Sequence, residues 1–252
     1  MKTDVKKVQR KLLSLVKEFD YICRTNNIDY SLHGGALLGA VRDRGFIPWD
    51  DDMDIAMSRA DFNRLKKVLK GNQSFKIVGG IKKQFKAKND SLSWVDIFIC
   101  DYISEKSIPR KVKLNLLTII DIMNRDRDSI KLSNLDKYSP LKKKVFYGVF
   151  YVGQLLPNRF KVMLYEKISM NMWLGNKTVM FRSNDQFKGR GEVFPKDWLN
   201  QYTNLKFENI DLMAIKKYED LLVKCYGTNY MTPIKDEKNQ VVHEMVRTKD
   251  IL

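Results

Sequence analysis

Four aspartates fall within residues 50–54, directly before an apolar run. The segment from Asp52 to Met57 alternates between polar and apolar residues, so a strand here would place Asp52 and Asp54 on one face. Because residues two apart on a strand point the same way, both carboxylates can reach one cation, and rigid oxygen ligands suit Mg²⁺ or Mn²⁺. We therefore predict that Asp52 and Asp54 hold a divalent metal ion.

Three further carboxylates have more than one interpretation. Asp50 and Asp51 can belong to the metal site or form a solvated acidic turn before it. Asp96 lies in the apolar run from Trp94 to Ile99, where an unpaired carboxylate would be costly to bury. It can be a third metal ligand, a proton acceptor for an attacking hydroxyl, or an ordinary aspartate at a strand end.

A glycine pair, Gly34 and Gly35, separates a predicted strand from Ile28 to His33 and a predicted helix from Ala36 to Arg42. Glycines let the backbone approach a phosphate closely, and the N–H groups at a helix N-terminus favour anions. The pair is also typical of a simple turn. We name it as a candidate site for the phosphates of a donor.

Three more side chains are candidates for donor binding. Arg42 can clamp a phosphate through paired N–H donors, and Arg59 follows the predicted metal strand. His33, beside the glycines, can contact phosphate or base. Each also has a structural interpretation, as a surface arginine or as a hydrogen-bonding histidine at a strand end. His243 lies in a polar C-terminal segment, and we do not expect it to be catalytic.

The periodicity along the chain predicts an α/β fold, a small mixed sheet with flanking helices and a helical insertion. An amphipathic N-terminal helix, from Val5 to Ile22, should pack on the core. Residues 1–110 would form the catalytic core, 111–177 a basic helical insertion, and 178–252 the strands and helix that complete the core. Further elements are predicted at Ser58 to Gly71, Phe75 to Val78, Trp94 to Cys100, Leu114 to Met123, Leu141 to Leu156, Phe160 to Trp173, Val179 to Arg182, Leu205 to Leu212 and Ala214 to Tyr226.

The net charge of +16, from 46 Lys and Arg against 30 Asp and Glu, would attract polyanions. Phosphorylated substrates and anionic lipid headgroups fit this charge, as does an inert basic surface. No nucleic-acid-binding motif accompanies it, so we expect no nucleic acid partner. Three scattered cysteines without metal-ligand spacing and a charged N-terminus without an apolar signal core favour a cytoplasmic location.

The insertion contains an apolar face flanked by basic residues. Its apolar members are Phe146, Val149, Phe150, Val152, Gly153 and Leu156, and its basic neighbours are Lys142, Lys143, Lys144 and Arg159. Core packing of an insertion helix is the favoured interpretation of the apolar face, and a helix lying on the inner face of an anionic membrane is the alternative. The near-apolar run from Val145 to Pro157 is too short to span a bilayer.

Two segments together resemble the signature of the LicD family. They are SLHGGALLGAVR at residues 31–42 and GFIPWDDDMDI at residues 45–55. This family belongs to the nucleotidyltransferase-fold superfamily and is related to fukutin and fukutin-related protein. Residues 207–209 and 226–233 resemble closing segments of the family more weakly, and residues 100–190 carry little recognisable pattern.

The resemblance implies transfer of a phospho-alcohol from a CDP-activated donor to a sugar of a cell-surface glycan or its lipid-linked precursor. Phosphocholine, glycerol phosphate and ribitol phosphate are all compatible groups. The glycine motif of the family falls on Gly34 and Gly35, its strand carboxylates on Asp52 and Asp54, and its expected third acid on Asp96. The oligomeric state stays open.

Two rival functions remain compatible with the same residues. A nucleotidyltransferase would use the same metal site but release pyrophosphate. A non-catalytic protein that binds polyanions would need no metal and would depend steeply on salt. The intact pair of Asp52 and Asp54 favours an enzyme.

Overall fold

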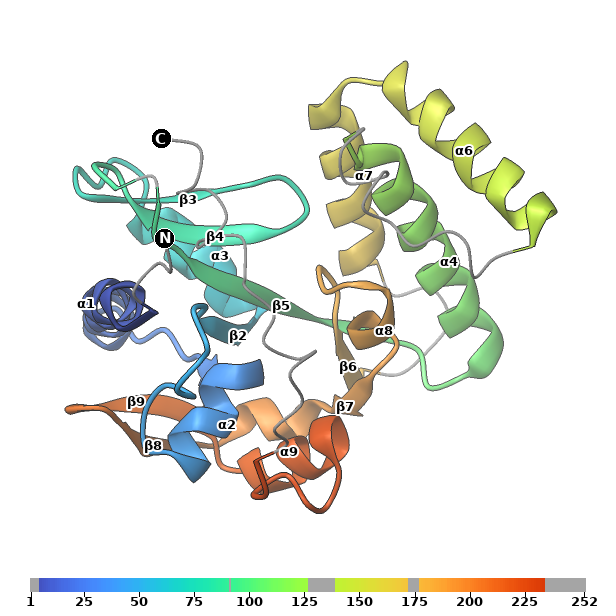
Figure 1. Cartoon of the computed structure of the whole chain (residues 1–252). Coiled ribbons are helices and arrows are strands. Elements are labelled where there is room, and N and C mark those ends of the chain that lie inside the picture. The colour runs from blue at the N-terminus through green and yellow to red at the C-terminus, as the bar shows by residue number, and fades with distance from the viewer. Residues whose placement is uncertain (1–4, 91, 127–138, 172–176, 234–252) are drawn as a thin grey trace. The chain divides into compact units, whose positions relative to one another are not determined.

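The structure is a computed structural model that describes residues 5–90, 92–126, 139–171 and 177–233 (Figure 1). The chain divides into two compact units, residues 1–100 with 196–252 and residues 101–195. Within the described residues, every helix is too short or too polar to cross a lipid bilayer. Trp173, the predicted end of an insertion helix, and His243 lie outside the described residues.

The N-terminal helix α1 (Val5–Thr25) buries the face that the sequence predicts. Leu12 and Phe19, seven residues apart, have no exposed surface, and Val8 and Leu15 continue the same stripe. These side chains join one hydrophobic cluster with residues of the sheet and of the C-terminal segment. Burial of such a stripe, about 1.5–3 kcal/mol for each large apolar side chain, fixes α1 on the first unit.

The first unit contains most of a mixed sheet with the strand order β1-β2-β5-β4-β3, which confirms the predicted α/β fold. Strands β2 and β5 are parallel, and the other neighbours along this path are antiparallel. The strands are β1 (Ser31–Leu32), β2 (Asp54–Ser58), β3 (Phe75–Val78), β4 (Lys83–Ala87) and β5 (Val95–Ile103).

The strand β2 begins two residues later than predicted, at Asp54, so Asp52 lies in the loop before it. The predicted alternation of side chains nevertheless extends into the end of this loop. Met53 and Ile55 are buried, while Asp52 and Asp54 are half-buried. The predicted strand from residue 28 is also shorter, since only Ser31 and Leu32 pair with β2. The carboxylates therefore sit at the start of a strand rather than along it.

Two helices of the first unit follow the predicted signals. Helix α2 (Gly34–Arg42) starts at the glycine pair, two residues earlier than predicted. Helix α3 (Arg59–Val68) is capped by Ser58, whose side chain accepts a hydrogen bond from the backbone N of Asp61 at 3.1 Å. This cap is the one expected from a serine followed three residues later by an acidic residue.

The C-terminal segment differs from the prediction. The single strand predicted from Leu205 to Leu212 is a hairpin, β8 (Tyr202–Phe207) and β9 (Ile210–Ile215), with a left-handed residue, Glu208, at its turn. Helix α9 (Tyr218–Tyr226) therefore begins later than predicted. A short 3-10 helix, η2 (Lys196–Asn200), precedes the hairpin.

The second unit is built around three helices, α4 (Ser107–Asn124), α6 (Pro140–Gln154) and α7 (Asn158–Met170). Both α6 and α7 pack against α4 (Figure 1). The strands β6 (Val179–Arg182) and β7 (Val193–Pro195) pair with each other, and β6 also pairs with β5. A single-turn helix, α8 (Phe187–Arg190), lies between them in sequence.

A buried lysine, Lys113, links backbone segments of the second unit through hydrogen bonds. The ammonium of Lys113 donates hydrogen bonds to the carbonyl oxygens of Tyr102, Ser169 and Asn171 at 2.8, 2.7 and 3.0 Å. Two of these carbonyls belong to the C-terminal end of α7, where a cation is favoured by the helix dipole. Lys113 is thus a structural cation that supplies the hydrogen bonds a helix end lacks.

Replacing Lys113 by Met should lower the free energy of unfolding by about 3 kcal/mol, because carbonyl groups that accept from the ammonium lose their donor. Urea denaturation measures this loss. Lys111→Met is the matched control, since Lys111 is on the same helix but exposed, and it should change stability by less than about 0.5 kcal/mol. Equal destabilisation by the two variants would contradict the structural role of Lys113.

Candidate functional site

The loop of residues 43–53, which we call the acidic loop, is held from two sides. From α1, the side-chain amide of Gln9 donates to the carbonyl oxygens of Ile47 and Asp50 at 3.1 and 2.8 Å. From the β8–β9 turn, the carboxylate of Glu208 accepts from the backbone N of Phe46 at 3.1 Å. These contacts fix the backbone from which the aspartates project.

The start of α2 lies against the start of β2. The backbone N of His33 donates to the carbonyl oxygen of Asp54 at 3.0 Å, and Gly34 follows with a φ of +56°. A Cβ added to Gly34 would collide with the carboxylate of Asp54, and one added to Gly35 would collide with that of Asp50. Both glycines are therefore required for this close approach, and the predicted glycine turn faces the predicted acids.

The side chains of Asp50, Asp52 and Asp54, which we call the acid cluster, concentrate negative charge at this place. Burial raises the pKa of Asp50 to about 8, with further contributions from the charge and hydrogen bond of Asp52 and from the charge of Asp51. Like charges at close range resist joint ionisation unless a cation compensates them. The first turn of α2 supplies part of that compensation through its dipole.

The acid cluster fits a divalent cation that takes only some of its ligands from the protein. Across residues 5–90, 92–126, 139–171 and 177–233, no three Asp, Glu, His or Cys side chains form a ready metal-ligating group. Mg²⁺ is commonly bound by one or two carboxylates, with substrate phosphates and water completing its shell. Burial of Asp50 next to the charges of Asp52 and Asp51, which together raise its pKa, is the observation that favours a cation here.

Asp96 lies beside the acid cluster in the sheet. It is the register partner of Asp54 in the parallel pair β2–β5. Its two carboxylate oxygens accept from Gln84 Nε2 at 3.0 Å and from Trp94 Nε1 at 3.1 Å. Burial raises the pKa of Asp96, against the lowering effect of these hydrogen bonds. Asp96 is therefore an oriented carboxylate whose proton affinity exceeds that of an ordinary aspartate.

The remaining predicted residues lie at different distances from the acid cluster. His33 is buried at the start of α2, and its ring meets Phe98 edge to face at 5.1 Å. Arg42 is at the opposite end of α2, about 12 Å along the helix from Gly34, and pairs with Asp43 at 2.8 Å. Arg59 follows the far end of β2. The structure therefore brings His33 to the site and places Arg42 at the far end of α2. Donor binding by Arg59 remains a prediction.

Tyr226, which the sequence analysis did not single out, lies near the acid cluster at the end of α9. Its pKa is raised by partial burial, by the adjacent Cys225 and by the charges of the three aspartates of the cluster. Helix α9 contacts α2, which explains how a C-terminal residue reaches the site. The resemblance of residues 226–233 to a closing segment of the family was the signal that pointed to it.

The elevated pKa of Asp50 predicts a pH effect on stability. A carboxyl group whose pKa is higher in the folded protein stabilises the fold while protonated, and this contribution is lost as the pH rises from 3.8 to about 8. Without divalent cations, the melting temperature should fall over this range less steeply for Asp50→Asn than for the wild type. The exposed control Asp211→Asn should keep the wild-type slope. An unchanged slope in Asp50→Asn would refute the raised pKa of Asp50 in the folded protein.

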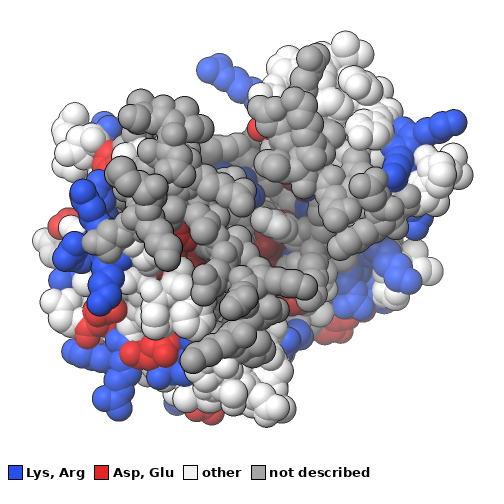
Figure 2. Space-filling view, in the orientation of Figure 1, with Lys and Arg blue, Asp and Glu red and all other residues white. Residues whose placement is uncertain are grey.

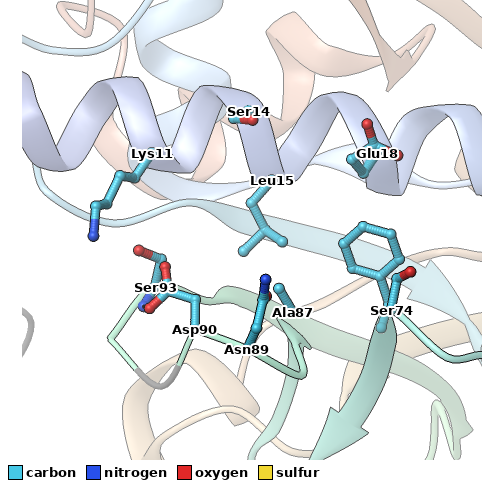
Figure 3. Close-up of a pocket in the computed structure, with 10 residues that line it drawn as sticks. Lys11, Ser14, Leu15, Glu18, Ser74, Ala87, Asn89, Asp90 and Ser93 are labelled. Atoms are coloured by element: carbon cyan, nitrogen blue, oxygen red, sulfur yellow. The ribbon is translucent and has the colours of Figure 1, made fainter.

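A cavity of about 510 Å³ lies elsewhere in the first unit, between α1 and the β3–β4 hairpin (Figure 3). Lys11 and Glu18 line it from α1, and Asp90 lines it from the following loop. The carboxylate of Asp90 accepts a hydrogen bond from the backbone N of Leu92 at 2.8 Å and so stabilises the loop to which Asp90 belongs. None of the predicted site residues lines this cavity, and we do not place the chemistry there.

Residues 27–121 match the family described as LicD/FKTN/FKRP, nucleotidyltransferase domain. The matched stretch contains the glycine pair, the acidic loop and Asp96. It leaves out Gln9 of α1 and the C-terminal contributions of Glu208 and Tyr226.

Similar proteins extend the comparison. The lipopolysaccharide cholinephosphotransferase LicD of Haemophilus influenzae is 26% identical over 96% of this chain and 98% of that protein. An uncharacterised protein of Rickettsia prowazekii is 35% identical over 143 residues, which make up 56% of this chain and 49% of that protein. An uncharacterised protein of Rickettsia typhi is 41% identical over 58 residues, 23% of this chain and 19% of that protein.

Proposed function

We propose that this chain is a phosphotransferase that moves a phospho-alcohol from a CDP-activated donor to a sugar, because residues 27–121 match the family described as LicD/FKTN/FKRP, nucleotidyltransferase domain. The acceptor would be a cell-surface glycan or its lipid-linked precursor, and the reaction would be cytoplasmic. Phosphocholine is the first candidate group, because the relative from H. influenzae is named a cholinephosphotransferase and aligns over nearly its whole length. The observation that carries the proposal is the acid cluster packed against the glycine turn.

Asp52 and Asp54 are the proposed ligands of a divalent cation, Mg²⁺ or Mn²⁺. Such a cation would neutralise charge on the donor phosphates and on the departing nucleoside monophosphate. Asp50 shares a hydrogen bond with Asp52, so its protonation state would determine the negative charge next to Asp52 and Asp54. The glycine pair keeps the first turn of α2 close enough for its N–H groups to face the same phosphates.

Asp96 is the proposed acceptor for the proton of the attacking sugar hydroxyl. Gln84 and Trp94 each donate to one of its oxygens, and each oxygen keeps a further lone pair for a substrate proton. Its raised pKa brings it closer to the pH at which a general base works best. We prefer this role to that of a third ligand because the described residues form no three-ligand group.

Product analysis distinguishes this proposal from nucleotidyl transfer. The purified protein is incubated with Mg²⁺ or Mn²⁺ and candidate glycan acceptors, with a panel of CDP-activated alcohols in one set of reactions and with nucleoside triphosphates in another. Release of CMP, with the phospho-alcohol on the sugar, is the expected result. Release of pyrophosphate from a nucleoside triphosphate, with the nucleotide on the acceptor, would instead favour the nucleotidyltransferase and overturn the proposal.

A further inference from the structure

Helix α6 has a well-defined inner face. Phe150 and Gly153 are buried, and Phe146 and Val149 pack with them against Ile122 of α4. A Cβ on Gly153 would collide with the backbone of α4 at Met123, so the two helices approach closely there. This packing confirms the favoured interpretation, an ordinary helix interface, for these four residues, whereas Val152, which the prediction placed on the same face, is 53% exposed. It also determines which side of α6 faces outward.

The outward face of α6 is apolar as well. Leu141, Val145 and Val152 are 72%, 60% and 53% exposed, and Leu155, the C-cap residue, is 83% exposed. At 100° per residue these four side chains fall within an arc of about 80°. A surface helix of a soluble protein normally places polar residues opposite its buried stripe. Here a second apolar stripe, which we call the outer stripe, takes that place.

The residues around the outer stripe are basic or amphipathic. Lys142 and Lys144 are exposed near its beginning, and Tyr151 is 62% exposed beside its end. The hairpin of residues 139–170 carries six Lys or Arg and one Glu, and α6 itself carries no acidic residue. In the region of α6, Figure 2 shows uncharged and basic side chains with hardly any acidic ones.

We propose that the outer stripe of α6 docks this protein on an anionic lipid surface. The four apolar side chains would enter the boundary between headgroups and acyl chains, Tyr151 would sit at headgroup level, and the lysines would contact anionic headgroups. With 15 residues, α6 is about 22 Å long, shorter than the hydrocarbon core of about 30 Å, so it would lie in the plane of the surface.

Charge complementarity selects lipid over a second copy of the chain as the occupant. An exposed apolar stripe of this kind marks an interaction site of some type. A second α6 would add three more lysines and no carboxylate, whereas an anionic leaflet offers a complementary charge to every lysine. This inference rests on packing and exposure in the second unit and does not depend on the proposed chemistry.

Co-sedimentation with lipid vesicles tests the proposal. The full chain should bind vesicles of phosphatidylcholine mixed with phosphatidylglycerol, more weakly at high salt, and should bind pure phosphatidylcholine poorly. The double variant Val145→Glu, Val152→Glu should lose binding at least about tenfold, since two charges would enter the apolar boundary. Lys142→Gln and Lys144→Gln should each weaken binding about fivefold.

The matched control is Tyr21→Glu, which places the same charge on an exposed aromatic residue of α1 and should bind as the wild type does. Circular dichroism should show that all variants are folded. The proposal is overturned if the wild type does not bind anionic vesicles or if the double glutamate variant binds equally well. A wild-type dimer that the double variant dissociates, without vesicle binding, would assign the stripe to a second copy instead.

Discussion

Asp54→Asn should reduce the rate of phospho-alcohol transfer by about 10³-fold, the size of effect expected when a group that stabilises developing charge is removed. The substitution keeps the shape of the side chain and removes its charge. The backbone pairing should survive, because the carbonyl of Asp54 accepts from His33 and its register with Asp96 uses main-chain atoms. The loss should therefore appear in kcat without a loss of fold. CMP release under saturating donor measures it.

Asp211→Asn is the matched control for this variant. It makes the same chemical change at an exposed carboxylate of β9, whose distance to Lys206 is 3.9 Å. Its rate should stay within about twofold of the wild type, as expected for a surface substitution. Comparable rates for Asp54→Asn and Asp211→Asn would show that the acid cluster has no part in the reaction.

Gly34→Ala should lower activity by about 10²-fold, since misplacing a catalytic group by about 1 Å has effects of this size. Its Cβ would lie 2.5 Å from Oδ2 of Asp54, closer than two such atoms can approach, so the carboxylate must move. The left-handed backbone at φ +56° adds strain of about 1–3 kcal/mol for any residue with a side chain. Steady-state kinetics and thermal unfolding together separate the two effects.

Gly71→Ala is the control that separates backbone strain from displacement of the Asp54 carboxylate. Gly71 has a similar left-handed conformation, with φ +85°, but a Cβ added there would meet nothing within 4 Å. Both alanine variants should be destabilised, and only Gly34→Ala should lose activity. If Gly71→Ala loses as much activity as Gly34→Ala, the effect at Gly34 comes from lower stability and not from the carboxylate.

Local sequence signals identified many elements of the fold. The strands β3 and β6 have the predicted boundaries, and the Ser58 cap of α3 follows from a short-range pattern. The strand β4 was missed because Lys83, Gln84 and Lys86 leave only Phe85 as a fully buried residue. Pairing with two neighbouring strands, which no local pattern reveals, holds that segment in the sheet.

Only those parts of the candidate site that are close together in sequence were predictable. The glycine pair and the aspartates are close in sequence, and the structure brings them together. Glu208 and Tyr226 approach the acidic loop from the C-terminal segment, and the hydrogen bond between Phe46 and Glu208 spans 162 positions. Contacts at such a separation depend on the tertiary fold. The catalytic roles of the site residues and the three-part domain organisation remain predictions.

Manganese binding tests the central claim, that the acid cluster holds the cation that carries the donor. Electron paramagnetic resonance follows free Mn²⁺ as it is titrated with protein in the presence of CMP. The wild type and Asp211→Asn should bind the ion, and the double variant Asp52→Asn, Asp54→Asn should not. Equal binding by the wild type and the double variant, or no binding by the wild type, would contradict the claim.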